Sequence, residues 1–172
     1  MKLAQCIILD LLKDYDPVPL LPETCNFHFS GVQLLDQDNP TDDPSILYIG
    51  TTTQISSFDT EKLKDFCIIC IGKKEDVSSY IENYQANLIL IPENHSLASV
   101  VNTLYTGFHR ILRWDAELQN AILSKQNYQS LFSIGGRFFG KNAMIMVNSS
   151  YNVIGTNLLE SPTHEKLDFI LK

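Results

Sequence analysis

The chain has 172 residues, of which 44% are apolar and 19% charged, and its formal net charge is −7. These values are typical of a globular protein, and the length fits one domain or one domain and part of another. The 13 lysines and arginines are scattered, which argues against a surface for nucleic acid or for anionic membranes. No apolar run approaches the roughly 18 residues of a membrane helix, and Asp10 interrupts the N-terminal apolar run. We therefore expect no signal peptide and no membrane attachment, and we predict a cytoplasmic protein.

Four cysteines raise the question of redox or metal chemistry: Cys6, Cys25, Cys67 and Cys70. The last two have the CxxC spacing that redox and zinc motifs use. They lie within the apolar run 66–71, which predicts a buried strand, and strand residues three apart point to opposite faces. No second CxxC and no HxxxH supplies further zinc ligands. We expect both cysteines to pack in the core and predict no metal and no cofactor.

The first 45 residues predict a helix, a strand and two irregular segments. Apolar residues at helical spacing predict a helix over 3–15, ended by a proline step. Residues 18–25 are rich in proline and predict an extended linker. Residues 27–35 alternate in part and predict a strand with a bend at Gly31. Residues 36–45 predict a solvated acidic loop, because they lack the residue order of a calcium-binding loop.

Three short apolar runs alternate with helix-forming segments in the first half of the chain. The strands are predicted at 46–49, 66–71 and 87–92, and the first two helices at 59–64 and 77–84. This order is the signature of right-handed βαβ units, and near-continuous apolar strands are typical of a parallel sheet covered on both faces. The sequence therefore predicts the α/β class, with a small Rossmann-like βαβαβ domain over residues 1–95.

Polar side chains follow two of these strands where each strand ends. Thr51, Thr52 and Thr53 come after the first strand, and Lys73 and Lys74 come after the second. Ligands bind at the carboxyl ends of strands in open α/β sheets, so the three threonines and Lys73 form a candidate ligand-binding set. No glycine-rich nucleotide motif accompanies them. The alternative is that the threonines cap the next helix and the lysines are merely solvated.

An amphipathic stripe predicts a long helix over residues 97–134, with one break near 124–129. The stripe recurs mostly at steps of three and four, which keeps it on one side of a helix. Its members are Leu97, Val101, Leu104, Phe108, Ile111, Leu118 and Ile122. The pair Gly135-Gly136 predicts the helix end. Two interpretations stay open: a core helix of a single domain, or a connecting helix over 96–136 whose stripe forms a homodimer interface.

The last segment, residues 137–172, predicts a β-hairpin and a final helix. Apolar runs at 143–147 and 153–155 flank a polar turn rich in Asn and Ser, which is typical of a hairpin. Residues 162–171 predict the helix. A lone hairpin is marginally stable in water, so we expect it to pack on the long helix or to belong to a larger domain.

The order of these elements resembles a known regulator family. The run Leu-Tyr-Ile-Gly-Thr at 47–51, then 67–72, then 86–92 and the helix beyond resemble the N-terminal domain of purine-catabolism-regulator-like transcription factors. The tracts 131–139 and 142–154 resemble the entrance to the GAF- or PAS-like sensor that follows in that family.

The resemblance implies a non-catalytic N-terminal region of a bacterial transcriptional regulator that senses a ligand, dimerises, or does both. As partners it implies a second copy and a small-molecule effector, with the DNA-binding domain downstream and no nucleic-acid contact by this segment. A small α/β enzyme is one alternative, but the sequence has no GxSxG, no HExxH and no paired histidines. A pure interaction scaffold is the other, and it would differ in lacking a ligand pocket.

Overall fold

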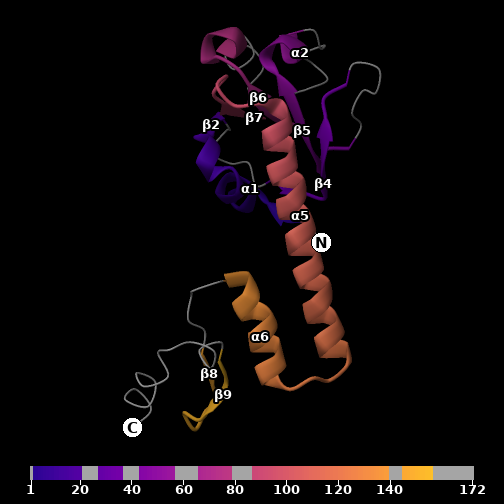
Figure 1. Ribbon diagram of the computed structural model, residues 1–172, viewed down its shortest axis with the longest axis vertical. Helices are drawn as coiled ribbons and strands as arrows, with labels where there is room; N and C mark the ends of the chain where they lie inside the picture. The colour runs from indigo at the N-terminus through magenta and orange to yellow at the C-terminus, as the bar shows by residue number, and fades with distance from the viewer. Residues whose placement is uncertain are drawn as a thin grey trace. The chain divides into compact units, whose positions relative to one another are not determined.

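The computed structural model describes residues 2–20, 27–36, 43–56, 66–78, 87–139 and 145–156 (Figure 1). Its internal contacts divide the chain into two compact units, Met1–His109 (unit 1) and Arg110–Lys172 (unit 2). The division falls inside helix α5 (Leu97–Leu123), so this one helix contributes to both units. No helix in the part of the chain that the structure describes is both long and apolar enough to cross a membrane.

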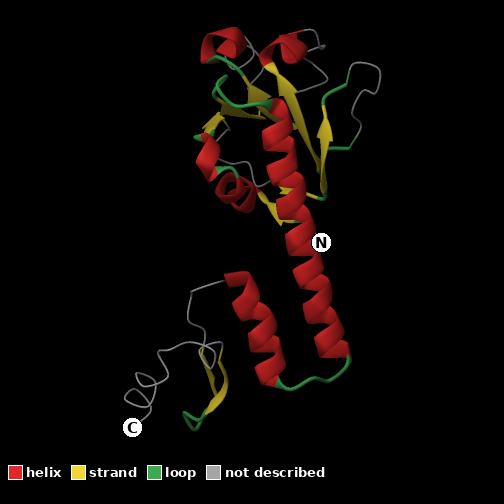
Figure 2. Cartoon of the chain, viewed as in Figure 1, coloured by secondary structure: helices red, strands yellow, loops and turns green. Residues whose placement is uncertain are grey.

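Unit 1 contains a five-stranded sheet with the strand order β2–β7–β6–β5–β4. Strands are drawn in yellow in Figure 2. The strands are β2 (Val18–Leu20), β4 (Gly31–Leu34), β5 (Ile46–Thr51), β6 (Cys67–Ile71) and β7 (Asn87–Ile91). Strands β4 to β7 pair in parallel, and Ile49, Ile69 and Ile89 lie side by side in register. The predicted α/β class with a parallel sheet is confirmed.

Strand β2 lies where the sequence predicted only an extended linker. It pairs antiparallel with β7, placing Val18 opposite Leu90 and Leu20 opposite Leu88. Pro19 lacks an N–H group, and proline is tolerated on an edge strand because one side of that strand pairs with nothing in the sheet. The proline content that suggested a linker therefore marks a sheet edge.

The predicted helix over 3–15 is divided into three shorter elements. Strand β1 (Leu3–Ala4) pairs antiparallel with β3 (His28–Phe29), and α1 (Gln5–Leu11) follows directly. A single 3-10 turn, η1 (Lys13–Tyr15), then leads to β2. The apolar spacing identified the buried face correctly, because Ile8 and Leu12 have no exposed surface.

The two faces of the main sheet bury different sets of side chains, because successive strand residues point to opposite sides. One face holds a core cluster with α2 (Thr52–Ser56) and the helical residues 74–78. That cluster consists of Leu35, Tyr48, Ile55, Ile68, Cys70, Val77, Leu88 and Leu90. The opposite face presents Leu47, Ile49, Ile69 and Ile89, all with no exposed surface. Both faces are covered, as parallel sheets require.

The first half of α5 is fixed to α1 and η1 within unit 1. Ser96 caps the helix, its Oγ accepting a hydrogen bond from the backbone N–H of Ser99 at 3.2 Å. The Tyr15 hydroxyl lies 2.7 Å from the Oγ1 of Thr103. A Cβ at Gly107 would lie 2.6 Å from a methyl carbon of Leu11. Glycine costs about 1 kcal/mol in a helix, and here it permits the close approach of α1.

The long helix ends at Leu123, and α6 (Tyr128–Phe139) begins after a short turn, so the predicted break is confirmed. The predicted stop at Gly135-Gly136 is wrong, because both glycines lie inside α6. Other residues make the break: Lys125 adopts a left-handed φ of 53°. Asn127 then caps α6, its Oδ1 accepting from the backbone N–H of Ser130 at 2.9 Å. A glycine pair permits a helix end but does not impose one.

The predicted hairpin is present in unit 2 as β8 (Ile145–Val147) and β9 (Val153–Thr156), paired antiparallel. It packs on α6, where the Gln129 amide donates to the carbonyl of Thr156 at 2.7 Å. A Cβ at Gly155 would lie 2.5 Å from the Phe132 ring, so glycine allows β9 to approach α6 closely. The predicted helices at 59–64 and 162–171 lie outside the described residues.

Candidate functional site

The predicted ligand threonines begin at the carboxyl end of β5, where they start α2. The backbone N–H of Thr51 donates to the Gln54 Oε1 at 2.9 Å, and the Gln54 N–H donates to the Thr51 Oγ1 at 3.3 Å. This reciprocal pair is a capping box, which satisfies two backbone donors at a helix start. The capping role proposed for the threonine run is therefore present, and it engages Thr51.

Thr52 is directed inward from the same edge. Its side chain is 8% exposed, and its Oγ1 donates to the Asp76 carboxylate at 3.4 Å. A Cβ at Gly72, which follows β6, would lie 2.3 Å from the Thr52 Cγ2. The two strand ends thus pack tightly against each other, and only a glycine fits at position 72.

The remaining predicted ligand residues are at the surface. Thr53 is exposed, and Lys73 forms an ion pair with Glu93 at 3.5 Å, with both side chains more than half exposed. The fold brings Thr51, Thr52 and Lys73 to one edge of the sheet, as predicted. Their polar groups bind neighbouring residues of the chain, and a ligand at this edge stays a prediction.

The CxxC cysteines lie in the core. Cys67 and Cys70 have no exposed surface, and Cys70 belongs to the core cluster beneath α2. Burial, with the charge of Asp76 nearby, raises the pKa of the Cys70 thiol to about 12. A thiol with that pKa is a poor nucleophile and a poor metal ligand at neutral pH. Among the described residues, no group of three His, Cys, Asp or Glu side chains is placed to hold a metal ion.

The predicted dimer stripe divides along the length of α5. Leu104, Phe108 and Ile111 are buried within the chain. Leu97, Val101 and Leu118 are half-buried, and Ile122 is 62% exposed. The buried members are unavailable to a second copy, because this chain already covers them. A charged residue at Leu104 or Phe108 would therefore test folding, and pairing of two copies stays a prediction.

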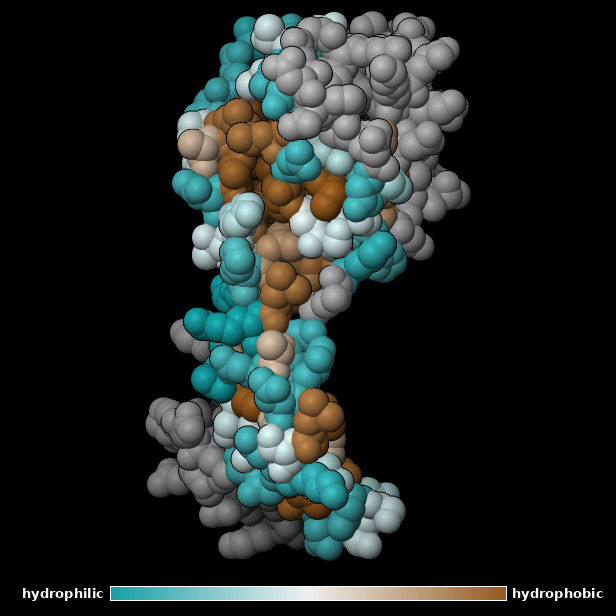
Figure 3. Space-filling model, turned by 90° about the vertical axis from the view of Figure 1, so that its right-hand side faces the viewer, coloured by the Kyte–Doolittle hydropathy of each residue, from teal (hydrophilic) through white to brown (hydrophobic). Residues whose placement is uncertain are grey.

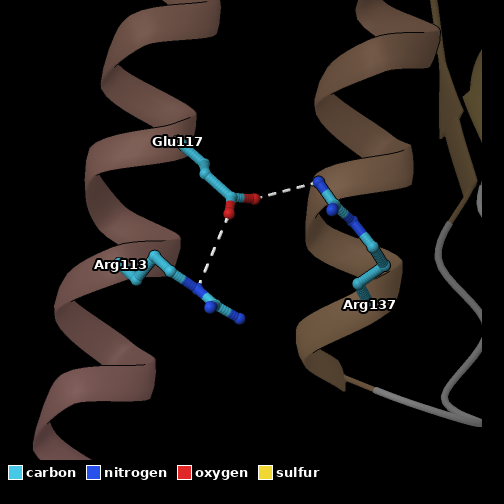
Figure 4. A network of polar contacts seen from close by, with 3 residues as sticks. All are labelled: Arg113, Glu117 and Arg137. Carbon is cyan, nitrogen blue, oxygen red and sulfur yellow. Dashed lines mark hydrogen bonds and ion pairs between the residues drawn. The ribbon is translucent and has the colours of Figure 1, made fainter.

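The sequence interpretation missed a network of charged side chains in unit 2 (Figure 4). Arg137 of α6 donates to the Glu117 carboxylate of α5 at 2.9 Å, and Arg113 lies 3.8 Å from the same carboxylate. The rings of Trp114 and Phe138 stack beside them with centroids 4.3 Å apart. Part of this pattern was visible in the sequence, because Arg113 and Glu117 are four residues apart and so lie on one helix face.

A cavity of about 570 Å³ opens beside this network within unit 2. Its lining comes from the end of α5, the turn after it and α6, and the residues are Glu117, Asn120, Ala121, Gln126, Asn127, Gln129, Ser130, Ser133, Ile134 and Arg137. Most of these side chains are amides, hydroxyls or charged groups. The volume lies within the range of small-molecule sites, about 300–1,000 Å³.

Comparison with known proteins found no relative of this chain. No family model matches it, and no curated protein or solved structure matches it.

Proposed function

We propose that this chain is a non-catalytic, cytoplasmic regulatory region of a bacterial transcriptional regulator of the purine-catabolism-regulator type. In this proposal unit 1 is the sensor, unit 2 pairs two copies and begins a GAF- or PAS-like domain, and a DNA-binding domain lies downstream. One observation carries it: α5 is a single helix of 27 residues that contributes to both compact units. In this proposal α5 carries energetic coupling between the two units, because such coupling travels through packed secondary-structure elements.

The two ends of α5 differ in how much apolar surface they bury. Val100 and Leu104 have no exposed surface, whereas Ile122 is 62% and Leu123 is 80% exposed. Tyr128, at the start of α6, is 56% exposed. We call Ile122, Leu123 and Tyr128 the pairing surface. Figure 3 shows brown apolar groups in both the upper and the lower part of the view, the larger area in the upper part.

Apolar groups of this size provide a driving force for association. Full burial of one such side chain contributes about 1.5–3 kcal/mol, while association costs of order 4–15 kcal/mol. Three side chains from each of two copies offset a cost in the lower part of that range. In a symmetric dimer the same surface contacts its own copy, so each buried residue counts twice. The expected pairing is therefore reversible and concentration-dependent.

Sedimentation equilibrium of three forms of the chain tests the proposal. The unmodified chain and a Leu34→Glu control should pair, because Leu34 is a half-exposed residue of β4 outside the pairing surface. The double variant Ile122→Glu, Leu123→Glu should remain a monomer with an unchanged circular dichroism spectrum. Pairing of the double variant at the same concentration as the unmodified chain would contradict the proposal.

A further inference from the structure

The three arginines of the chain all lie within one short segment of unit 2. They are Arg110 and Arg113 on α5 and Arg137 on α6. Arg113 and Arg137 flank the Glu117 carboxylate, and the guanidinium of Arg110 lies 5.9 Å from the centre of the Phe138 ring. One carboxylate neutralises one of three positive charges, so the cluster retains a surplus.

This surplus stands out against the charge of the rest of the chain. Residues 1–109 carry 6 basic and 15 acidic side chains, a net charge of −9. Residues 110–172 carry 7 basic and 5 acidic side chains, a net charge of +2. Unit 2 is therefore the part of this acidic chain whose net charge favours an anion.

The guanidinium of Arg137, which lines the cavity, has N–H donors that its contact with Glu117 does not use. A guanidinium has five N–H donors in a planar fork that fits carboxylate and phosphate oxygens. Arg137 uses one short contact, at 2.9 Å to Glu117, and its side chain is 68% exposed. Arg113 is 81% exposed, and its contact with Glu117 is longer, at 3.8 Å. Arg137 lines the cavity and can contact an oxyanion there without breaking a buried contact, whereas Arg113 adds positive charge nearby through its contact with Glu117.

The cavity offers further polar groups next to Arg137. Asn120, Gln126 and Ser133 line it, and within the described part of the chain their side chains make no hydrogen bond. Asn127 and Ser130 also line it, but they bind each other at the α6 cap. Amide and hydroxyl groups suit a hydrophilic ligand that both donates and accepts hydrogen bonds.

We propose that this cavity binds a small hydrophilic oxyanion, in which Arg137 holds a carboxylate or phosphate group. Asn120, Gln126 and Ser133 contact the polar body of the ligand. Glu117 orients Arg137 and competes with the ligand for its donors. The site gives the proposed regulator a ligand class that binds in unit 2, and only that regulatory meaning rests on the proposed function. Binding is measured separately from pairing, so either can fail alone.

Calorimetric titration of the full chain with succinate and, separately, inorganic phosphate tests the site, with sodium chloride at equal ionic strength as the reference. At least one of the two oxyanions should give a saturable binding heat that chloride does not give. The oxyanion with the higher affinity then shows whether the site prefers a carboxylate or a phosphate group. Arg137→Gln should weaken binding about tenfold or more, because it removes charge-assisted hydrogen bonds. Glu117→Gln should tighten binding several-fold, because it removes the competing carboxylate. Lys13→Gln, the same charge change at an exposed residue of unit 1 that is paired with Asp10, should leave binding unchanged.

A second readout needs no variant. Addition of the binding anion should shift the NMR signals of the side-chain amides of Asn120 and Gln126 in the unmodified chain. No saturable binding by either oxyanion beyond chloride would overturn the site. Undiminished affinity in Arg137→Gln would overturn the site as well. Weaker binding in Glu117→Gln would also overturn it, because it would show that the Glu117 carboxylate does not compete with the ligand.

Discussion

The two central strands β6 and β7 of unit 1 and strand β8 of unit 2 show opposite degrees of burial. All five residues of β6 and all five of β7 are buried in unit 1. The three residues of β8 in unit 2 are each more than 40% exposed. Polar groups differ in the same way. At the carboxyl ends of β5 and β6 they form a capping box and an ion pair within the chain. The side chains of Arg113 and Arg137 in unit 2 are more than half exposed. The central strands of unit 1 are covered within the chain, whereas β8 and the arginines of unit 2 remain open to partners and ligands.

The largest expected difference in stability is between substitutions of two leucines of α5. Leu104 has no exposed surface and Leu123 is 80% exposed. Leu104→Ala should lower the free energy of unfolding by about 2–5 kcal/mol, because it leaves a cavity in the core of unit 1. Leu123→Ala should change it by less than about 0.5 kcal/mol. Urea denaturation followed by circular dichroism measures both, and equal effects would contradict the difference between the two ends of α5.

A smaller effect is expected at the tight contact between the ends of β5 and β6. In Gly72→Ala the new Cβ would lie 2.3 Å from the Thr52 Cγ2, and the φ of 154° at that position is one that side chains disfavour. The substitution should cost about 1–3 kcal/mol of stability through overpacking and backbone strain. The control is Gly31→Ala, whose Cβ would lie at an ordinary 3.4 Å from Ile46. Thermal unfolding should give a lower melting temperature for Gly72→Ala than for Gly31→Ala. Equal melting temperatures for the two variants would contradict it.

The smallest expected effect is a pH dependence from the core of unit 1. Burial raises the pKa of the folded Cys70 thiol from 9.0 to about 12, so above pH 9 the unfolded chain loses this proton first. The stability that this thiol contributes is therefore full below pH 9.0 and is lost as the pH rises toward about 12. The slope is at most about 1.4 kcal/mol per pH unit.

Urea denaturation at several pH values between 8 and 11 measures this slope in the unmodified chain and in Cys70→Ala. The variant lacks the thiol, so its stability should fall less steeply over the range. Identical slopes would show that the Cys70 thiol ionises in the folded state as it does in the unfolded chain.

Much of unit 1 could be predicted because its strands are short apolar runs bounded by turn residues. The run at 46–49 lies within β5, and the run at 87–92 extends one residue beyond β7. Thr51 and Gln54 form the helix cap that the threonine run indicated. The pairing of β2 could not be predicted from the prolines alone. A proline disfavours a central strand but permits an edge strand, and only the tertiary structure decides between an edge and a linker.

The candidate sites were harder to predict, because periodicity identifies an apolar stripe without showing what covers it. Leu104 and Ile122 belong to one stripe, yet the chain buries the first and exposes the second. The contact between Glu117 and Arg137 depends on the turn at Lys125, which folds α6 back along α5. The clustering of all three arginines within 110–137 was the available sequence signal for that site.

Multi-angle light scattering of the unmodified 19.5 kDa chain, from about 1 μM to several hundred micromolar, tests the central claim that unit 2 keeps a surface open for a second copy. The account predicts a mass that rises with concentration toward twice that of one chain. A mass that stays at 19.5 kDa over the whole range would contradict it.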